Sequence, residues 1–186
     1  MRAAAARSAA LALLVLAGVC LGADRTTERR YKLFDQGVLL LRAPADWEDE
    51  LREAPPSHPP TIQFQPSGGK PFRVFVTPIW RSRPEIPLPS RDWLRERVER
   101  SAEKLGESAL EKRIEVVAFR GRSGPGFYFS ATHKAPRPGE LPHLTQGMMQ
   151  VSELLVTFTI LTGPGQKLVV RDALTMLRGA SHVPPQ

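Results

Sequence analysis

Two histidines and a glutamate near the ends of one predicted loop are the strongest candidates for chemistry in this sequence. His133, Glu140 and His143 lie in the stretch HKAPRPGELPH, between two predicted strands. Zinc and iron accept two imidazoles and a carboxylate as ligands, and paired strands would bring the two loop ends together. None of the three residues has the spacing of a metal motif on a regular element. We therefore expect no metal and no cofactor, and keep a small metal-dependent hydrolase using these residues as an alternative.

A second candidate is the turn Gly163–Lys167 (GPGQK), which joins a predicted strand to a predicted helix. Free backbone N–H groups at the start of a helix attract anions, and Lys167 adds a positive charge. Pro164 removes one donor, and an ordinary strand-to-helix connection explains the glycines equally well. Gly163, Gly165 and Lys167 are thus a speculative anion site, suited to a carrier of a small anionic ligand.

The third candidate is a contact surface formed by Trp80, Arg81 and Arg83. These residues open a proline-rich link that follows a predicted strand. Tryptophan and arginine are enriched where proteins recognise partners. We expect Trp93 to be buried beside the apolar stripe of a helix, and Trp47 to pack over a sheet edge. Trp80 is therefore the tryptophan that could contact a partner protein. The alternative is that it packs within an ordinary loop.

Alternating apolar residues and turn sequences predict four pairs of strands that would position these candidates. We expect a leader over 24–30 and an irregular segment over 44–60. Short links between paired strands predict a mostly antiparallel sheet. The predicted strand pairs are 31–34 with 38–42, 61–65 with 72–79, 113–119 with 127–132, and 144–151 with 154–162.

Two helices are predicted to cover this sheet. Ser90 caps the first, which runs to about Glu107 and has Leu94, Val98, Ala102 and Leu105 at helical spacing. The second runs from Gln166 to Arg178, with Gly179 as its stop. We expect four of its residues to face inward: Leu168, Ala173, Leu174 and Leu177. The fold class is therefore α+β, in a single domain over residues 31–180 followed by a disordered tail over 181–186.

The charge pattern bears on the partners of this domain. The formal net charge is +7, but the basic residues are spread along the chain and interleaved with glutamates. Nucleic-acid binding is therefore not expected. A mildly basic face could make peripheral contact with an anionic membrane surface. The oligomeric state is left open by the sequence.

The first 23 residues have the three parts of a secretory signal peptide. Arg2 and Arg7 precede an apolar run over residues 9–21, which is followed by small residues up to Ala23. We expect cleavage after Gly22 or Ala23 and a periplasmic or secreted location in a Gram-negative bacterium. Cys20 also invites interpretation as a lipoprotein cysteine, but Val19 stands where such signals need a small residue. A cleaved signal peptide, which removes the only cysteine, is favoured.

The order of these elements, with Pro44-x-x-Trp47 after an early hairpin and a helix at the end, resembles the PsbP-like superfamily, which includes DcrB-like envelope proteins. The segments GFYFSATHKAPRPGE, LTQG, LLVTFTILT and ALTMLRGA look like a family of small exported proteobacterial proteins. The resemblance spans residues 31–180. It implies an α/β/α sandwich that commonly serves as a non-enzymatic binding or assembly module, and it supplies no active-site residues.

These observations favour an exported, non-catalytic binding or assembly module with a protein partner in the cell envelope. No nucleophile, nucleotide loop or metal motif stands out, so we do not expect an enzyme. The alternatives are the metal-dependent hydrolase above and a carrier of a small apolar or anionic ligand, held between sheet and helix or at the GPGQK turn.

Overall fold

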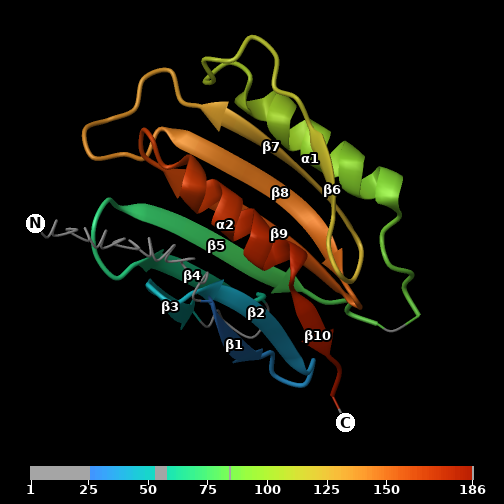
Figure 1. Cartoon of the computed structure of the whole chain (residues 1–186). Coiled ribbons are helices and arrows are strands. Elements are labelled where there is room, and N and C mark those ends of the chain that lie inside the picture. Colours follow the sequence, from blue (N-terminus) through green and yellow to red (C-terminus); the bar gives the residue numbers. More distant parts are fainter. Residues whose placement is uncertain (1–25, 53–57, 84, 186) are drawn as a thin grey trace, which may run out of the picture.

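Two antiparallel sheets and two helices form the part of the chain that the computed structural model describes, residues 26–52, 58–83 and 85–185 (Figure 1). The predicted signal peptide and Cys20 lie outside these residues. The larger sheet has seven strands in the order β3-β4-β5-β9-β8-β7-β6. The strands are β3 (Trp47–Arg52), β4 (Thr61–Pro66), β5 (Phe72–Ile79), β6 (Val117–Arg120), β7 (Pro125–Thr132), β8 (His143–Val151) and β9 (Leu154–Thr162).

Alternation along the strands assigns one face of this sheet to the main core. In β9 every second residue from Leu154 to Thr162 is buried, and the residues between them are half-buried. β9 is the middle strand of the seven, flanked by β5 and β8. Val74, Val76, Val156, Phe158 and Ile160 belong to one buried cluster. Burial of this apolar area is the main favourable term in folding.

The smaller sheet pairs β1 (Thr26–Lys32) and β10 (Ser181–Val183) with β2 (Val38–Pro44). It corrects two predictions, because most of the expected leader is in β1 and the expected tail begins with β10. It also lies beside the first strands of the larger sheet (Figure 1). Tyr31 of β1 donates a hydrogen bond to Asp49 of β3 at 2.6 Å, and Arg29 forms an ion pair with the same carboxylate.

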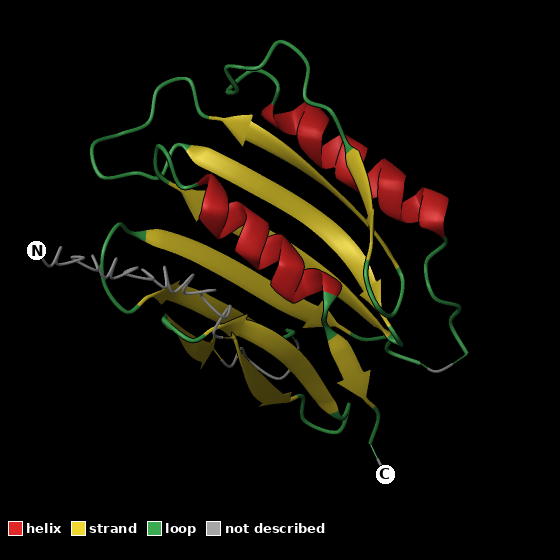
Figure 2. Ribbon diagram, in the orientation of Figure 1, coloured by secondary structure: helices red, strands yellow, loops and turns green. Residues whose placement is uncertain are grey.

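The two helices pack on opposite faces of the larger sheet (Figure 2). α1 (Arg91–Leu105) begins at Ser90, whose side chain accepts a hydrogen bond from the Trp93 amide at 3.1 Å, as predicted. It packs on β7 and β8. α2 (Lys167–Arg178) lies against β9 and against β2 of the smaller sheet. The structure therefore confirms the α+β class with a mostly antiparallel sheet between helices.

Two residues of the predicted helix stripes do not face the core. Trp93 is 38% exposed and lies under the guanidinium of Arg97, because Leu94, one position on, faces the sheet. Leu168 is 62% exposed. At 100° per residue it lies about 180° around α2 from Leu177, which is fully buried. Trp47, in contrast, is buried against Phe64 and Phe72 as predicted.

Two strand predictions also change. The segment 44–60 was expected to be irregular, but β3 occupies its middle and pairs with β4. The strand expected over 113–119 is only four residues long in β6, which pairs with β7 at the sheet edge. Both are edge strands with largely exposed side chains, so their pairing depends on the neighbouring strand more than on an apolar pattern.

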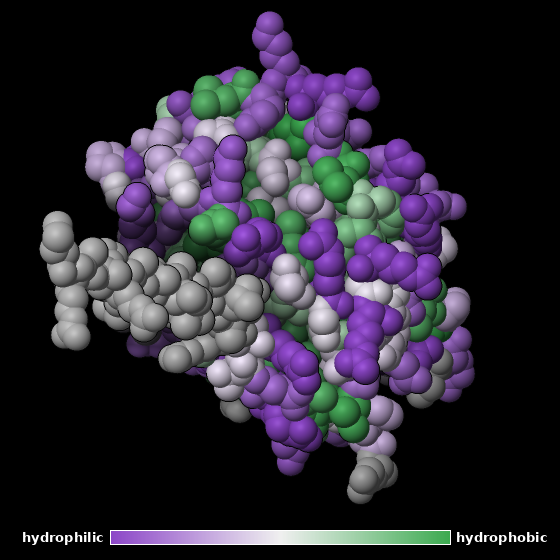
Figure 3. Space-filling view, viewed as in Figure 1, coloured by the Kyte–Doolittle hydropathy of each residue, from purple (hydrophilic) through white to green (hydrophobic). Residues whose placement is uncertain are grey.

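On the face of the larger sheet that packs against α1, part of the surface has no helix over it. Phe127 and Phe129 of β7 are covered by α1, whereas Thr157 and Thr159 on the same face of β9 are half-buried. The other side of the molecule, where α2 lies, faces the viewer in Figure 3 and is mostly hydrophilic with separate apolar patches. No helix of the described residues is long and apolar enough to cross a membrane.

Candidate functional site

The hairpin of β7 and β8 separates the two histidines of the predicted cluster. Thr132 pairs with His143 at the end of the hairpin, and the His133 amide donates to the Pro142 carbonyl at 2.9 Å. Successive side chains of a strand point to opposite faces. His133 and Glu140 border one cavity, and His143 borders another. Among the described residues, no group of three or more His, Cys, Asp or Glu side chains is placed to hold a metal ion.

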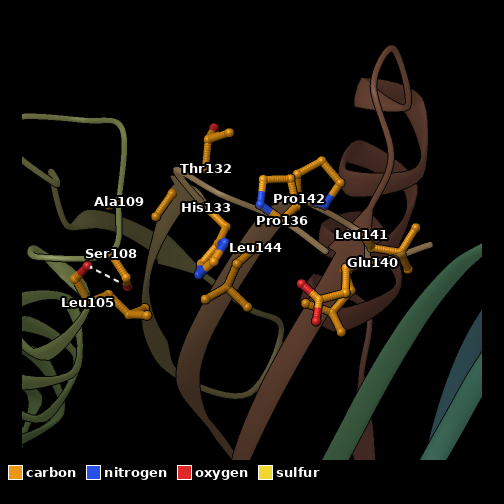
Figure 4. Close-up of a pocket in the computed structure, with 12 residues that line it drawn as sticks. Leu105, Ser108, Ala109, Thr132, His133, Pro136, Glu140, Leu141, Pro142 and Leu144 are labelled. Atoms are coloured by element: carbon orange, nitrogen blue, oxygen red, sulfur yellow. Dashed lines mark hydrogen bonds between the residues drawn. The ribbon is translucent and has the colours of Figure 1, made fainter. Parts of the chain in front are cut away.

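The cavity beside His133 lies between the end of α1 and the loop over residues 133–142 (Figure 4). Its volume is about 290 Å³. His133 and Glu140 lie on either side of Leu144 in Figure 4, and both are exposed at the rim. Most of the lining side chains are apolar: Leu105, Ala109, Ala131, Pro136, Leu141, Pro142, Leu144 and Leu161.

Backbone hydrogen bonds hold the walls of this apolar cavity in place. The Lys134 amide donates to the Ser108 carbonyl, and the Leu110 amide donates to the Thr132 carbonyl, at 2.9 and 2.8 Å. These bonds join the turn after α1 to the end of β7. Opposite them, the Glu140 carboxylate accepts from the Arg137 amide at 2.8 Å. The cavity is thus formed before any ligand arrives, which lowers the entropic cost of binding.

The floor of the apolar cavity comes from two neighbouring strands, β8 and β9. Leu144 of β8 and Leu161 of β9 are cross-strand partners, and both are half-buried. α1 packs on β7 and β8 and contributes only its last residue, Leu105, to the cavity, and both leucines remain partly exposed. An apolar group entering the cavity would remove both side chains from water, which is favourable.

A second cavity of about 330 Å³ lies on the opposite face of the same sheet end, beside the start of α2. It contains the predicted anion residues Gly163, Gly165 and Lys167, together with His143. Sequence reasoning treated these as two separate candidates, and the structure brings them together. It adds residues that sequence reasoning missed: Glu111, Ser130, Thr132, Thr145, Thr162 and Gln166.

Hydrogen bonds order the polar wall of this second cavity. Glu111 accepts from the Thr132 amide at 2.8 Å, and the Thr132 hydroxyl lies 3.2 Å from His143 Nδ1. Partial burial of Glu111 acts to raise its pKa. The hydrogen bonds from Thr132 and the nearby imidazole of His143 outweigh this effect, so the pKa of Glu111 is lowered. Glu111 is therefore negatively charged at neutral pH.

The predicted contact residues Trp80, Arg81 and Arg83 are only partly available to a partner. Trp80 is half-buried against the main core, and its ring meets the edge of Phe34 with centroids 6.3 Å apart. Arg81 donates to the Ile86 carbonyl at 3.0 Å and lies 3.8 Å from Glu153. Arg83 is exposed. Phe34, which is 52% exposed and has a φ of 46°, is the aromatic neighbour that sequence reasoning missed.

Comparison with known proteins identifies the fold. No family model and no curated protein matches the sequence. The solution structure of cyanobacterial PsbP (CyanoP) from Synechocystis superposes over 90% of this chain and 99% of its own, with a TM-score of 0.50 and 12% identity. The fold is PsbP-like. The crystal structure of LpqN, a Mycobacterium tuberculosis protein involved in cell envelope biogenesis, also matches at a TM-score of 0.50 and 12% identity, over 86% of this chain and 92% of that one.

At 12% identity, the likeness to these two structures shows the fold alone. The resemblance to PsbP-like proteins that the order of the elements indicated is confirmed as a likeness of fold. Membership of a proteobacterial family remains a prediction.

Proposed function

We propose that this chain is an exported, non-catalytic binding module of the bacterial cell envelope, which holds a small apolar group in the cavity between α1 and the 133–142 loop. The observation that carries this proposal is the cavity itself, with mostly apolar walls, the exposed His133 and Glu140 at its rim and edges held by hydrogen bonds. Such a pocket favours binding of an apolar ligand, with His133 and Glu140 fixing its orientation. Two further observations support the envelope location: the predicted signal peptide, and a neighbour in LpqN that takes part in envelope biogenesis.

The size of the apolar cavity limits what it holds. Its volume of about 290 Å³ is at the lower end of the range of ligand pockets, which begins near ~300 Å³. This space suits an aromatic ring or a short acyl segment better than a whole lipid. Because the cavity opens to solvent through the rim, the rest of a larger molecule can remain outside. We infer that the bound group is the end of a ligand or of a partner's side chain.

A charge placed on the cavity floor tests this proposal. Leu161→Lys puts an ammonium group among apolar walls, where it disfavours an apolar guest. Thr159→Lys is the matched control, since Thr159 lies on the same strand and face, is also half-buried and is not part of the cavity. The neutral fluorophore N-phenyl-1-naphthylamine, which brightens in apolar surroundings, serves as the probe.

We expect saturable brightening with the wild-type protein and with Thr159→Lys, and a loss of roughly tenfold or more in affinity with Leu161→Lys. Equal affinity in all three proteins would place the probe elsewhere and refute the cavity as the site. An equal loss in both variants would show that the open sheet face, rather than the cavity, attracts the probe.

A protein partner in the envelope is the second part of the proposal. Phe34 favours it, because an exposed aromatic ring in a strained backbone conformation lies against Trp80, next to Arg81 in the sequence. Arg83 is exposed, so Arg83→Glu changes this surface without disturbing the core. The variant should melt like the wild type and capture fewer envelope proteins after crosslinking in cells. Unchanged capture would remove Arg83 from the contact surface.

A further inference from the structure

The part of the larger sheet that α1 leaves uncovered is polar and carries no acid over its central strands. The structure describes β4, β5, β8 and β9 in full, and these four strands contain no aspartate or glutamate. On their uncovered side the one charged side chain is that of Arg73. We call this surface the open face and define it by six half-buried residues: Arg73, Phe75, Thr77, Gln146, Thr157 and Thr159.

The strand register arranges the open face in rows. Phe75 of β5 pairs with Thr159 of β9, and Thr159 pairs with Gln146 of β8, so that a ring, a hydroxyl and an amide lie side by side. Thr77 and Thr157 form the next row of the same face. Hydroxyl and amide groups both donate and accept hydrogen bonds. The centre of the open face therefore matches a ligand rich in hydroxyl groups.

Arg97 of α1 lies along the border of the open face. Glu99 and Glu103 border a cavity with residues of the segment 111–116, which marks the side of α1 that faces β6. At 100° per residue, Arg97 lies about 160° around the helix from Glu99. Arg97 is therefore on the other side of α1, the side toward β9.

Arg97 differs from its neighbours on α1 in having no acidic partner. Arg95 pairs with Glu99 at 2.8 Å, and Arg100 pairs with Glu96 at 3.4 Å. The guanidinium of Arg97 instead lies 5.6 Å from the centre of the exposed Trp93 ring. Among the described residues, no carboxylate lies within ion-pair distance of Arg97 or of Arg73.

The acidic residues on the same side of the larger sheet are at its far edge. Glu48 and Glu50 are on the edge strand β3, where Glu48 accepts from Gln65 at 3.2 Å and Glu50 pairs with Arg52 at 3.1 Å. Both carboxylates thus have partners on their own strand or the next one. The open face and the adjoining side of α1 carry a positive charge that a ligand of opposite sign would complement.

We propose that the open face, together with Arg97 and Trp93, binds an acidic polysaccharide. Arg97 and Arg73 are suited to its acidic groups, and the threonines and Gln146 to its hydroxyls. The aromatic rings of Phe75 and Trp93 offer apolar surface to the C–H groups of the sugars. α1 has 15 residues and is about 22 Å long, so a linear polymer can lie along it over several sugar units.

A protein segment fits the open face less well. The core of a protein interface is built on apolar and aromatic anchors. Here the apolar neighbours Leu144, Met148 and Leu155 already pack against the cluster under α1, and hydroxyl and amide groups occupy the centre. The open face is not part of the apolar cavity, so this inference does not depend on the proposed function.

Oligogalacturonate, a linear chain in which each sugar carries one carboxylate, is the probe, and binding is measured by calorimetry at about 0.15 M salt, where weak surface attraction is screened. Dextran is the uncharged reference, and poly-L-glutamate at matched carboxylate concentration is the acidic polypeptide reference. We expect the wild-type protein to bind oligogalacturonate saturably, to bind poly-L-glutamate at least tenfold more weakly, and to show no binding of dextran.

Two pairs of variants locate the site. Arg97→Glu should lose at least tenfold in affinity for oligogalacturonate, whereas Arg95→Glu makes the same charge change on the opposite side of α1 and should bind like the wild type. Thr159→Val keeps the shape of a strand residue, removes one hydroxyl and should lose roughly fivefold. Thr27→Val, on an exposed position of β1, is its control.

Four results would overturn the proposal. The wild type might fail to bind oligogalacturonate, or bind dextran or poly-L-glutamate equally well, which would show that a charged sugar chain is not what the surface recognises. Equal losses in Arg97→Glu and Arg95→Glu would show general attraction of a polyanion. Unchanged affinity in Thr159→Val, with a melting temperature like that of the wild type, would remove the open face from the site.

Discussion

Tyr31 is the residue that most directly ties the smaller sheet to the larger one. Its ring is buried against Phe64, and its hydroxyl donates to Asp49, which is also paired with Arg29. Arg29 in turn donates to the Trp47 carbonyl and lies 6.0 Å from the centre of the Phe64 ring. One hydroxyl, one carboxylate and one guanidinium thus connect β1 to β3. The sequence does not reveal this connection, because β1 and β3 are not adjacent in either sheet.

Replacing Tyr31 tests the strength of this connection. Tyr31→Phe keeps the buried ring and removes the hydrogen bond to Asp49, so the free energy of unfolding at neutral pH should fall by about 1 kcal/mol. Denaturant unfolding of both proteins measures the difference. Tyr31→Leu, which also removes the ring contact with Phe64, should cost more than Tyr31→Phe. No difference between wild type and Tyr31→Phe would show that the hydroxyl contributes nothing to joining the sheets.

Tyr31 also makes the free energy of unfolding depend on pH. Burial raises the pKa of Tyr31 above its ordinary value of 10.0, although the positive charge of Arg29 acts in the opposite direction. The folded protein therefore holds this proton more tightly than the unfolded chain. Stability from this group is fully present below pH 10 and is lost as the pH rises further. Tyr31→Phe should consequently lose less stability than the wild type between pH 9 and pH 11, measured by denaturant unfolding.

At the scale of elements, β9 is the central strand of the larger sheet, and its side chains alternate between the two faces of that sheet. Val156 has no exposed surface and belongs to the main core, whereas Thr157 next to it faces the opposite, partly open side. Val156→Asp would bury an unpaired carboxylate and should abolish cooperative unfolding. Thr157→Asp adds the same charge to the same strand and should leave a cooperative, moderately lowered transition. Similar melting curves for both variants would contradict the assignment of Val156 to the central core.

Elements with a strong apolar period were predictable, and those without one were not. The alternation in β5 and β9, the cap at Ser90 and the stripe of α1 are all local features of the sequence. β1 and β3 have mostly exposed side chains, and β10 is three residues long, so their pairing is decided by the strands beside them. The expectation that Leu168 faces inward was wrong, because this residue lies on the side of α2 opposite the fully buried Leu177.

The two cavities, like the fold, could be predicted from the sequence only in part. The GPGQK turn, His133 and His143 were visible as chemically capable residues, and each of them does border a cavity. Which of them share a cavity depends on the register that pairs Thr132 with His143 and on where α1 ends over the sheet. Leu105, Leu144 and Leu161 carry no local signal of a binding site, since leucines that pack against a core are ordinary in any fold.

At the scale of the whole molecule, we propose that the predicted export signal is combined with a PsbP-like domain that has an open apolar cavity. Native mass spectrometry of the mature protein, isolated from the periplasm of the bacterium that expresses it, tests this combination directly. We expect a chain that begins at Ala23 or Asp24, accompanied by a non-covalently bound apolar molecule that is absent from the Leu161→Lys variant and present in Thr159→Lys. A chain that begins at an acylated Cys20, a wild-type protein without any bound molecule, or a ligand retained by Leu161→Lys would contradict this proposal.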